Sequence, residues 1–110
     1  MMFLINYGPG KNADKESYNR LDAGVKALGN WSSRIPNTWL LEAPRLNANN
    51  IRDRLKQFLD DEGGDQLFVA RISKNWAGRN MGNGFPEWLK RREFGNFVPV
   101  PAPEAEGQVQ

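Results

Sequence analysis

The sequence predicts an α+β domain of the ferredoxin-like class, in which strands and helices follow one another in the order β-α-β-β-α-β. Apolar runs at residues 2–7, 38–43 and 66–72 have the composition of strands. Two segments between them place apolar residues at helical spacing behind a capping residue. Because the connections are short, we expect a four-stranded antiparallel sheet with both helices on one face, followed by a short C-terminal helix and an extended tail.

The first strand is expected over residues 2–7, where Phe3, Leu4 and Ile5 are consecutive. A run of this kind is typical of a central strand that is buried on both faces. The sequence "GPG" ends the strand, and Asp14 or Asn12 can cap a helix after it. That helix carries apolar residues at helical spacing and stops at a glycine: Tyr18, Leu21, Val25, Leu28 and Gly29.

A β-hairpin is expected next, with a weak strand over residues 31–35, a Pro-Asn turn and a stronger strand over residues 38–43. Asn47 can cap a second helix, which the glycine pair at residues 63–64 ends. The apolar face of that helix consists of Ile51, Leu55, Phe58 and Leu59.

The fourth strand is "QLFVARI", residues 66–72. With both helices on one side, the opposite face of the sheet needs a cover of its own. A second copy, a ligand or the chain's own C-terminal segment can supply it.

Residues 73–84, "SKNWAGRNMGNG", have no periodicity and are expected to form a loop, and Pro86 suits the first turn of a helix over residues 85–92. We therefore expect one ferredoxin-like domain over residues 1–96. Residues 97–110, "FVPVPAPEAEGQVQ", are expected to be an extended or disordered Pro-rich tail. Their alternating valines are compatible with an arm that covers a dimer partner.

The composition limits the chemistry open to this chain. The 110 residues contain no cysteine and no histidine, which removes disulfides, the usual zinc sites and Ser-His-Asp or Cys-His catalysis. Catalysis would need carboxylates, Tyr, Lys, Arg or a carboxylate-bound hard metal ion. We name no catalytic residue, no metal site and no cofactor. The apolar start "MMFLINYG" is too short for a signal peptide or a membrane span, so we expect a cytoplasmic protein without a membrane partner.

The stretch "LINYGPGKNAD", residues 4–14, places glycines and Lys11 between the first strand and the first helix. A phosphate cradle needs the spacing G-x-x-x-x-G-K-[ST], whereas Gly8 and Gly10 are one residue apart and Asn12 follows the lysine. A tight turn is the simpler interpretation, with Lys11 as an outside candidate for an anion contact. The acidic run at residues 60–65 lacks the spacing of a calcium loop, and we interpret it as a solvated turn.

Basic residues concentrate between residues 71 and 92, where Glu87 is the one acid; they are Arg71, Lys74, Arg79, Lys90, Arg91 and Arg92. A solvated helix face is the alternative interpretation of the last three. Trp76 lies among basic, glycine and asparagine residues, a combination that can stack a base and hold phosphate, with packing as the alternative. Trp39, Leu41 and Trp88 are expected in the core or in a dimer interface. The candidate anion contacts are Lys74, Trp76, Arg79 and Arg91.

Several motifs resemble one known group: "LINYGPG", "NTWLL" in the hairpin, "RDRLKQFLD" in the second helix, "LFVARIS" in the fourth strand and "W…G…FPEWLK" near the C-terminus. Over about residues 2–92 the chain resembles SinR-like members of the superfamily that includes the second CRISPR-associated protein, a ferredoxin-fold adaptation subunit, and the VapD toxins. The resemblance implies a homodimer with its two sheets packed together and, in several relatives, a metal-dependent nuclease. Those relatives carry an aspartate directly after the first-strand tyrosine, where this chain has Gly8.

Three hypotheses of function follow. The first is a small non-catalytic homodimeric binding or regulatory module that contacts nucleic acid or another phosphate-bearing partner through the basic aromatic loop. The second is a regulator or inhibitor that captures a nucleotide-like small molecule or a protein at the dimer seam, using loops 8–13 and 73–84. The third is a metal-dependent endonuclease, which Gly8 disfavours because glycine offers no metal ligand. We favour the first.

Overall fold

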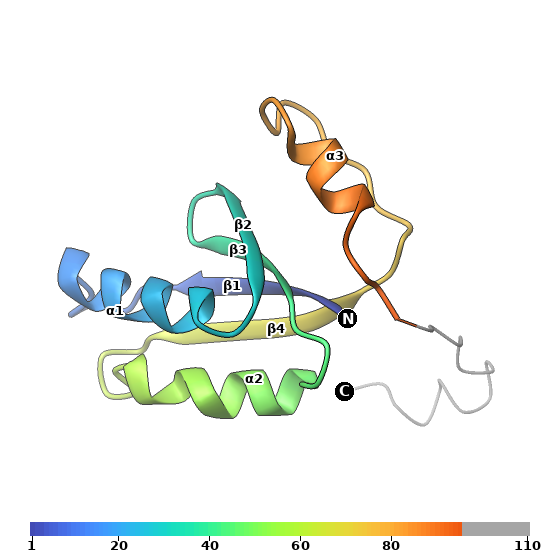
Figure 1. Cartoon of the computed structure of the whole chain (residues 1–110). Coiled ribbons are helices and arrows are strands. Elements are labelled where there is room, and N and C mark those ends of the chain that lie inside the picture. Colours follow the sequence, from blue (N-terminus) through green and yellow to red (C-terminus); the bar gives the residue numbers. More distant parts are fainter. Residues whose placement is uncertain (96–110) are drawn as a thin grey trace, which may run out of the picture.

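The structure, a computed structural model, describes residues 1–95. Its four strands form one sheet in the order β2-β3-β1-β4, and each neighbouring pair is antiparallel. The elements are β1 (Met2–Gly8), α1 (Lys15–Lys26), β2 (Asn30–Ile35), β3 (Thr38–Glu42), α2 (Ala48–Leu55), the 3-10 turn η1 (Lys56–Phe58), β4 (Gln66–Ile72) and α3 (Phe85–Lys90) (Figure 1). This is the ferredoxin-like arrangement that the sequence predicts.

The main core lies between the sheet and the pair α1 and α2. Side chains alternate along a strand, so Phe3, Ile5 and Tyr7 of β1 all point to the helix side. Trp39 and Leu41 of the neighbouring β3 do the same and are completely buried. They meet the buried faces of the two helices, which consist of Leu21, Val25, Ile51 and Leu55. The helical spacing in the sequence therefore identified core positions correctly.

Both helices begin at the caps that the sequence predicts. The Asp14 side chain accepts a hydrogen bond from the Ser17 backbone N–H at 2.8 Å, and the Asp14 backbone N–H donates to the Ser17 hydroxyl at 2.9 Å. Asn47 and Asn50 form the same reciprocal pair at the start of α2. These bonds satisfy N–H groups that have no partner within the first turn of a helix.

The second helix is shorter than the sequence predicts. It passes into η1 and ends before the glycine pair at residues 63–64, because acidic side chains bind the following backbone. Asp65 accepts a hydrogen bond from the Asp60 N–H at 2.9 Å, and Asp60 accepts one from the Gly63 N–H at 3.0 Å. The result is a closed loop instead of further helix.

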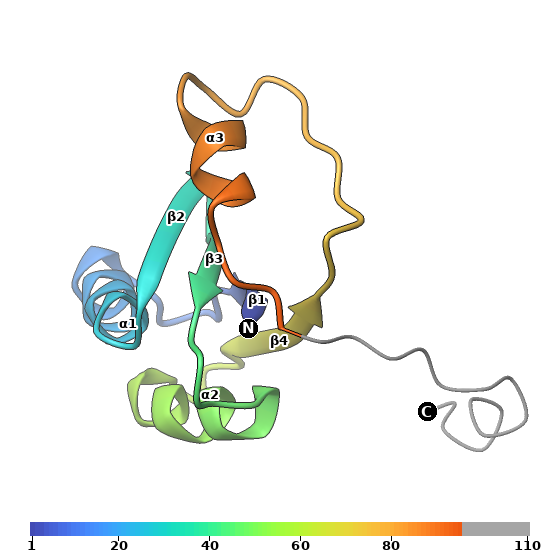
Figure 2. The same cartoon turned by 45° about the vertical axis from the view of Figure 1, so that its right-hand side comes forward.

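The second face of the sheet is covered over only part of its area. Phe85 and Leu89 of α3, with Phe94 beyond it, pack against Met2 of β1 in a second, smaller core. Figure 2 shows α3 on the side of β2 and β3, far from α2. Farther along β1, Asn6 is exposed, so the expectation of a strand buried on both faces is correct at Met2 and wrong toward the other end. The helix predicted over residues 85–92 ends at residue 90, and the predicted tail lies outside the described residues.

Candidate anion-binding site

Four residues line an open cleft of about 450 Å³ beside α3: Lys74, Trp76, Lys90 and Phe94. Lys74 and Trp76 come from the loop after β4, Lys90 from the last turn of α3, and Phe94 from the segment behind it. We call this the cationic cleft. Two lysines beside aromatic side chains combine a charge that attracts phosphate with a ring on which a base can stack.

Trp76 takes part in both packing and the cleft. Its ring lies 6.3 Å from that of Phe85, edge to face at 78°, and the indole is half-buried against the second core. The same side chain lines the cationic cleft. The two interpretations that the sequence left open for Trp76 are therefore compatible, because one side chain can pack on Phe85 and still face the cleft.

Two of the basic residues between 71 and 92 hold the C-terminal segment on the sheet. The Arg92 guanidinium lies 3.4 Å from a Glu42 carboxylate oxygen and 5.0 Å from the centre of the Trp88 ring. Arg71 donates a hydrogen bond to the Phe94 carbonyl at 3.0 Å. The remaining basic side chains of this region are exposed: Lys74, Arg79, Lys90 and Arg91.

Glu42 is the acidic side chain that binds the segment after α3, through Arg92 and the Glu93 backbone N–H. Burial raises the pKa of the Glu42 carboxyl, but hydrogen bonds from the Asn30 side chain and the Glu93 backbone N–H, together with the charge of Arg92, lower it more. The Asn30 amide lies 2.8 Å from the carboxylate. The net effect is a pKa below the usual value of 4.5, so Glu42 is ionised where it meets Arg92.

The other predicted contacts lie outside the cleft. Arg79 is in the loop before α3 and Arg91 follows the last residue of that helix, so the whole helix, about 9 Å long, lies between them in the chain. Lys11 lies at the opposite end of the sheet, because β1 pairs Met2 with Ile72 but Gly8 with Gln66. That distance is about 20 Å along the strand. The structure thus brings Lys74 and Trp76 together, but not Lys11.

Two backbone donors of the turn that contains Lys11 bind other parts of the chain. The Gly10 N–H donates to the Asp65 carboxylate at 2.7 Å, and the Lys11 N–H donates to the Gly63 carbonyl at 2.9 Å. The Asn12 side-chain amide donates to the Asp60 carboxylate at 3.0 Å. A phosphate cradle needs such N–H groups to point at its ligand, so the geometry favours the interpretation as a tight turn.

Gly8 ends β1 beside Gln66. A Cβ at Gly8 would lie 2.8 Å from the Gln66 side-chain oxygen and 3.2 Å from its Cβ, so an aspartate there requires the Gln66 side chain to move. Within residues 1–95, no group of three or more Asp, Glu, His or Cys side chains is placed to hold a metal ion.

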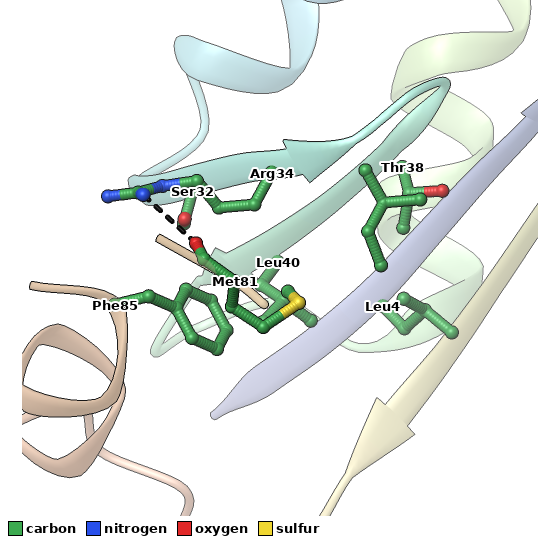
Figure 3. A pocket seen from close by; sticks show the side chains of 8 residues that line it. Leu4, Ser32, Arg34, Thr38, Leu40, Met81 and Phe85 are labelled. Carbon is green, nitrogen blue, oxygen red and sulfur yellow. Dashed lines mark hydrogen bonds between the residues drawn. The ribbon is translucent and has the colours of Figure 1, made fainter. Parts of the chain in front are cut away.

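A smaller apolar pocket of about 70 Å³ lies at the edge of the second core. Figure 3 shows Met81 and Phe85 beside Leu4 and Leu40 of the sheet, while Arg34 reaches across to the Met81 carbonyl. The uncovered part of the sheet face begins at this pocket, which Ile35 lines, and continues to Phe68. Both are exposed apolar side chains, Ile35 at 49% and Phe68 at 62% exposure.

These features define a ferredoxin-like domain with a C-terminal helix over part of its second sheet face and a cationic cleft beside that helix. No protein-family model matches the chain, and no curated protein sequence matches it. Among solved structures the chain is similar to Cas2 of Streptococcus pyogenes, crystallised at pH 6.5. The TM-score is 0.48 and the sequence identity 23%, over 69% of this chain and 90% of that chain. The fold assignment rests on strand order and register, and the wider likeness to SinR-like and VapD-like proteins stays a prediction.

None of the helices in residues 1–95 combines the length and the apolar character needed to span a lipid bilayer.

Sequence reasoning missed three residues that shape this region. Lys90 belongs to the basic residues of the region but not to the predicted contacts, although from the last turn of α3 it lines the cleft together with Lys74 and Trp76. The residues next to Phe94 in the sequence do not indicate that it is buried, because a main packing partner, Met2, is far away in the chain. Arg34 lies in a weak strand, and nothing in its neighbourhood indicates a contact with residues 81 and 83.

Proposed function

We propose that this protein is a small, non-catalytic, homodimeric module that binds nucleic acid or another phosphate-bearing partner through the cationic cleft and its flanks. One observation supports this more than any other: Lys74, Trp76 and Lys90 line the same cleft although the loop and α3 bring them from separate elements. Arg79 precedes α3 in the chain, Arg91 follows it, and both side chains are exposed, so they add positive charge to this region. Lys11 is an outlying contact that only a long partner could reach.

The chemistry of the cleft suits a flexible anionic chain. Exposed lysines bind phosphate through charge, whereas an aromatic face accepts any base, so this combination favours single-stranded nucleic acid without strong sequence preference. The half-buried Trp76 is fixed by Phe85, which lowers the entropy cost of presenting its ring.

The uncovered sheet face supports the homodimer. Ile35 and Phe68 are large apolar side chains that remain exposed in the single chain, and Leu4 lies half-buried between their strands. Thr38 and Asn6 lie between Ile35 and Phe68 in the same row of the sheet, so this face is partly polar. Large apolar side chains on a sheet face that nothing else covers still favour a partner, and a two-fold pairing would let each copy cover the other.

The experiment is a titration of a fluorescently labelled single-stranded oligonucleotide, followed by anisotropy at several salt concentrations. Lys74→Glu with Lys90→Glu should weaken binding and reduce the slope of log K against log salt by about 1.4, because two phosphate contacts are lost. Lys15→Glu with Lys56→Glu changes the net charge equally on the exposed helix side and is the matched control. Charge reversal at Arg79 and Arg91 tests the flanks. If neither cleft nor flank reversals weaken binding of any tested anion, the proposal is wrong.

A second candidate function is capture of a nucleotide-like small molecule or a protein at the dimer seam. The apolar pocket opens on the sheet face that we assign to the dimer. Its volume of about 70 Å³ would hold one apolar group of such a ligand, and the rest of the ligand would lie between the two copies. Native mass spectrometry of freshly purified protein separates the two functions. A bare dimer agrees with the first function, and a discrete additional mass of nucleotide size agrees with the second.

A further inference from the structure

We propose that Arg34 is a latch that holds the loop at residues 78–84 on the sheet and thereby positions Trp76 for anion binding. The binding part of this inference rests on the proposed function, whereas the structural part rests on hydrogen bonds within the chain. Arg34 does not line the cationic cleft, so its role is that of a positioning residue.

The Arg34 guanidinium bridges two carbonyl groups of the loop. One terminal nitrogen donates to the Met81 carbonyl at 3.0 Å, and the other donates to the Asn83 carbonyl at 3.3 Å. A planar guanidinium presents its donors as a fork, which suits two acceptors that flank one residue. These bonds tie the edge strand β2 to a segment that follows it by more than forty residues.

Gly82, between those two carbonyls, is adapted to the guanidinium. Its backbone has φ +90°, which side chains of L-residues rarely adopt, and a Cβ there would lie 2.3 Å from an Arg34 terminal nitrogen. Gly84 has a similar φ of +84° but nothing within 4 Å of its Cβ position. The close approach of Arg34 therefore distinguishes Gly82 from a glycine under the same backbone constraint.

Side-chain packing connects the latch to the cleft. Met81 and Phe85 lie at the two ends of the turn that Arg34 binds. Both pack in the second core, where they also line the small apolar pocket (Figure 3). The Phe85 ring is the edge-to-face neighbour of Trp76, and Trp76 lines the cationic cleft. Loss of the latch should therefore loosen the Phe85 support on which the orientation of Trp76 depends.

The loop itself has few other restraints. Residues 77–80 and 82–84 are exposed, and such segments open locally at low free energy because little apolar area is buried. Two hydrogen bonds from a charged donor can change the population of the open loop by about tenfold.

Trypsin measures this opening without any ligand, since Lys74 and Arg79 are cleavage sites in the loop. In the full chain, Arg34→Gln should increase the rate of cleavage at these two sites by about fivefold or more, because cleavage of a loop tracks the open population. Equal rates in the variant and the wild type would overturn the latch.

The two glycines provide the matched comparison. Gly82→Ala should open the loop more than Gly84→Ala, because only the first also displaces Arg34. When each is combined with Arg34→Ala, this difference should disappear. A difference that persists without Arg34 would mean that backbone strain alone explains Gly82.

Binding of the labelled oligonucleotide tests the positioning role. Arg34→Lys keeps the charge but replaces the fork by a single ammonium, so a loss of affinity of about threefold or more must come from position. Arg45→Lys, at an exposed position, is the control and should bind like the wild type. Unchanged affinity in Arg34→Lys, with faster cleavage, overturns the positioning role. Absence of binding by the wild type overturns the proposed function instead, while the cleavage rates still decide the latch.

Discussion

The guanidinium of Arg92 lies 3.4 Å from the carboxylate of Glu42, and this pair joins the segment behind α3 to an interior strand of the sheet. Both side chains are mostly buried, with 17% and 14% of their surface exposed. The pair works together with the second core, in which Phe94 and Leu89 pack on Met2. This ion pair, the Arg71 hydrogen bond to the Phe94 carbonyl and one small apolar cluster therefore hold the segment that carries Phe94 beside the cationic cleft.

Glu42→Gln should lower the free energy of unfolding by about 1–3 kcal/mol at neutral pH, because the buried guanidinium of Arg92 loses its charged partner. The pKa of Glu42 is lowered in the folded chain, so its stabilising effect is complete above the usual value of 4.5 and is lost as the pH falls through the lower folded value. Urea unfolding at about pH 7 and about pH 3 should show a difference between variant and wild type that shrinks in acid.

Glu87→Gln, on the exposed side of α3, is the control for Glu42→Gln and should leave the unfolding free energy nearly unchanged. A Glu42→Gln effect of equal size at both pH values would contradict the assigned charge pairing.

Trp39→Phe should cost about 1–3 kcal/mol of stability. The Trp39 ring is fully buried, stacks 5.7 Å from Tyr18 and donates its indole N–H to Asp22 at 2.9 Å. Phenylalanine leaves a cavity and an acceptor without its donor. Trp31→Phe, at a ring that is 41% exposed, is the comparison and should cost much less in the same thermal or urea unfolding.

Gly10→Ala should destabilise the fold strongly, because its Cβ would lie 2.3 Å from the Gly63 carbonyl oxygen and 2.7 Å from the Asp65 nitrogen. Both are backbone atoms and cannot rotate away. A Cβ added at Gly64 would have no atom within 4 Å. Gly64→Ala should therefore lower stability only through backbone strain at φ +87°, by about 1 kcal/mol. Calorimetric Tm values rank the two variants, and an equal Tm would show that the turn does not pack as tightly as these distances indicate.

Phe68→Asp should shift the proposed homodimer toward monomer, because a charge at this exposed position of β4 would be buried without a partner. Sedimentation velocity over a range of concentrations measures the shift. Asp53→Asn, on the exposed surface of α2, is the control. A wild type that is monomeric at all concentrations would remove the dimer from the proposed function.

Gly8→Asp tests the remaining alternative of an endonuclease. If the chain once shared a metal site with its predicted relatives, magnesium-dependent cleavage of an oligonucleotide should arise in Gly8→Asp and be missing in the wild type. Gly8→Ala places a similar Cβ against Gln66 without a ligand and controls for local disturbance. Cleavage by the wild type would show that the chain is an enzyme despite Gly8.

Much of this fold could be predicted from local pattern. The helical spacing of Leu21 and Val25 and the capping residues Asp14 and Asn47 appear in the structure as predicted. These features depend on neighbours within about four residues, so each can be predicted from its own segment of the sequence. The limits of β4 were predicted for the same reason.

The sequence by itself therefore determined the order of elements, the inward face of each helix and the concentration of basic residues between residues 71 and 92. Tertiary structure alone decided which of those residues share a cleft. The cleft forms only when α3 and the loop after β4 have folded against the sheet. It assigned Arg92 to Glu42 and Arg34 to the loop, and it separated Lys11 from Lys74. Such contacts join residues that are tens of positions apart, and their energies depend on distance and burial in space, which local spacing does not contain.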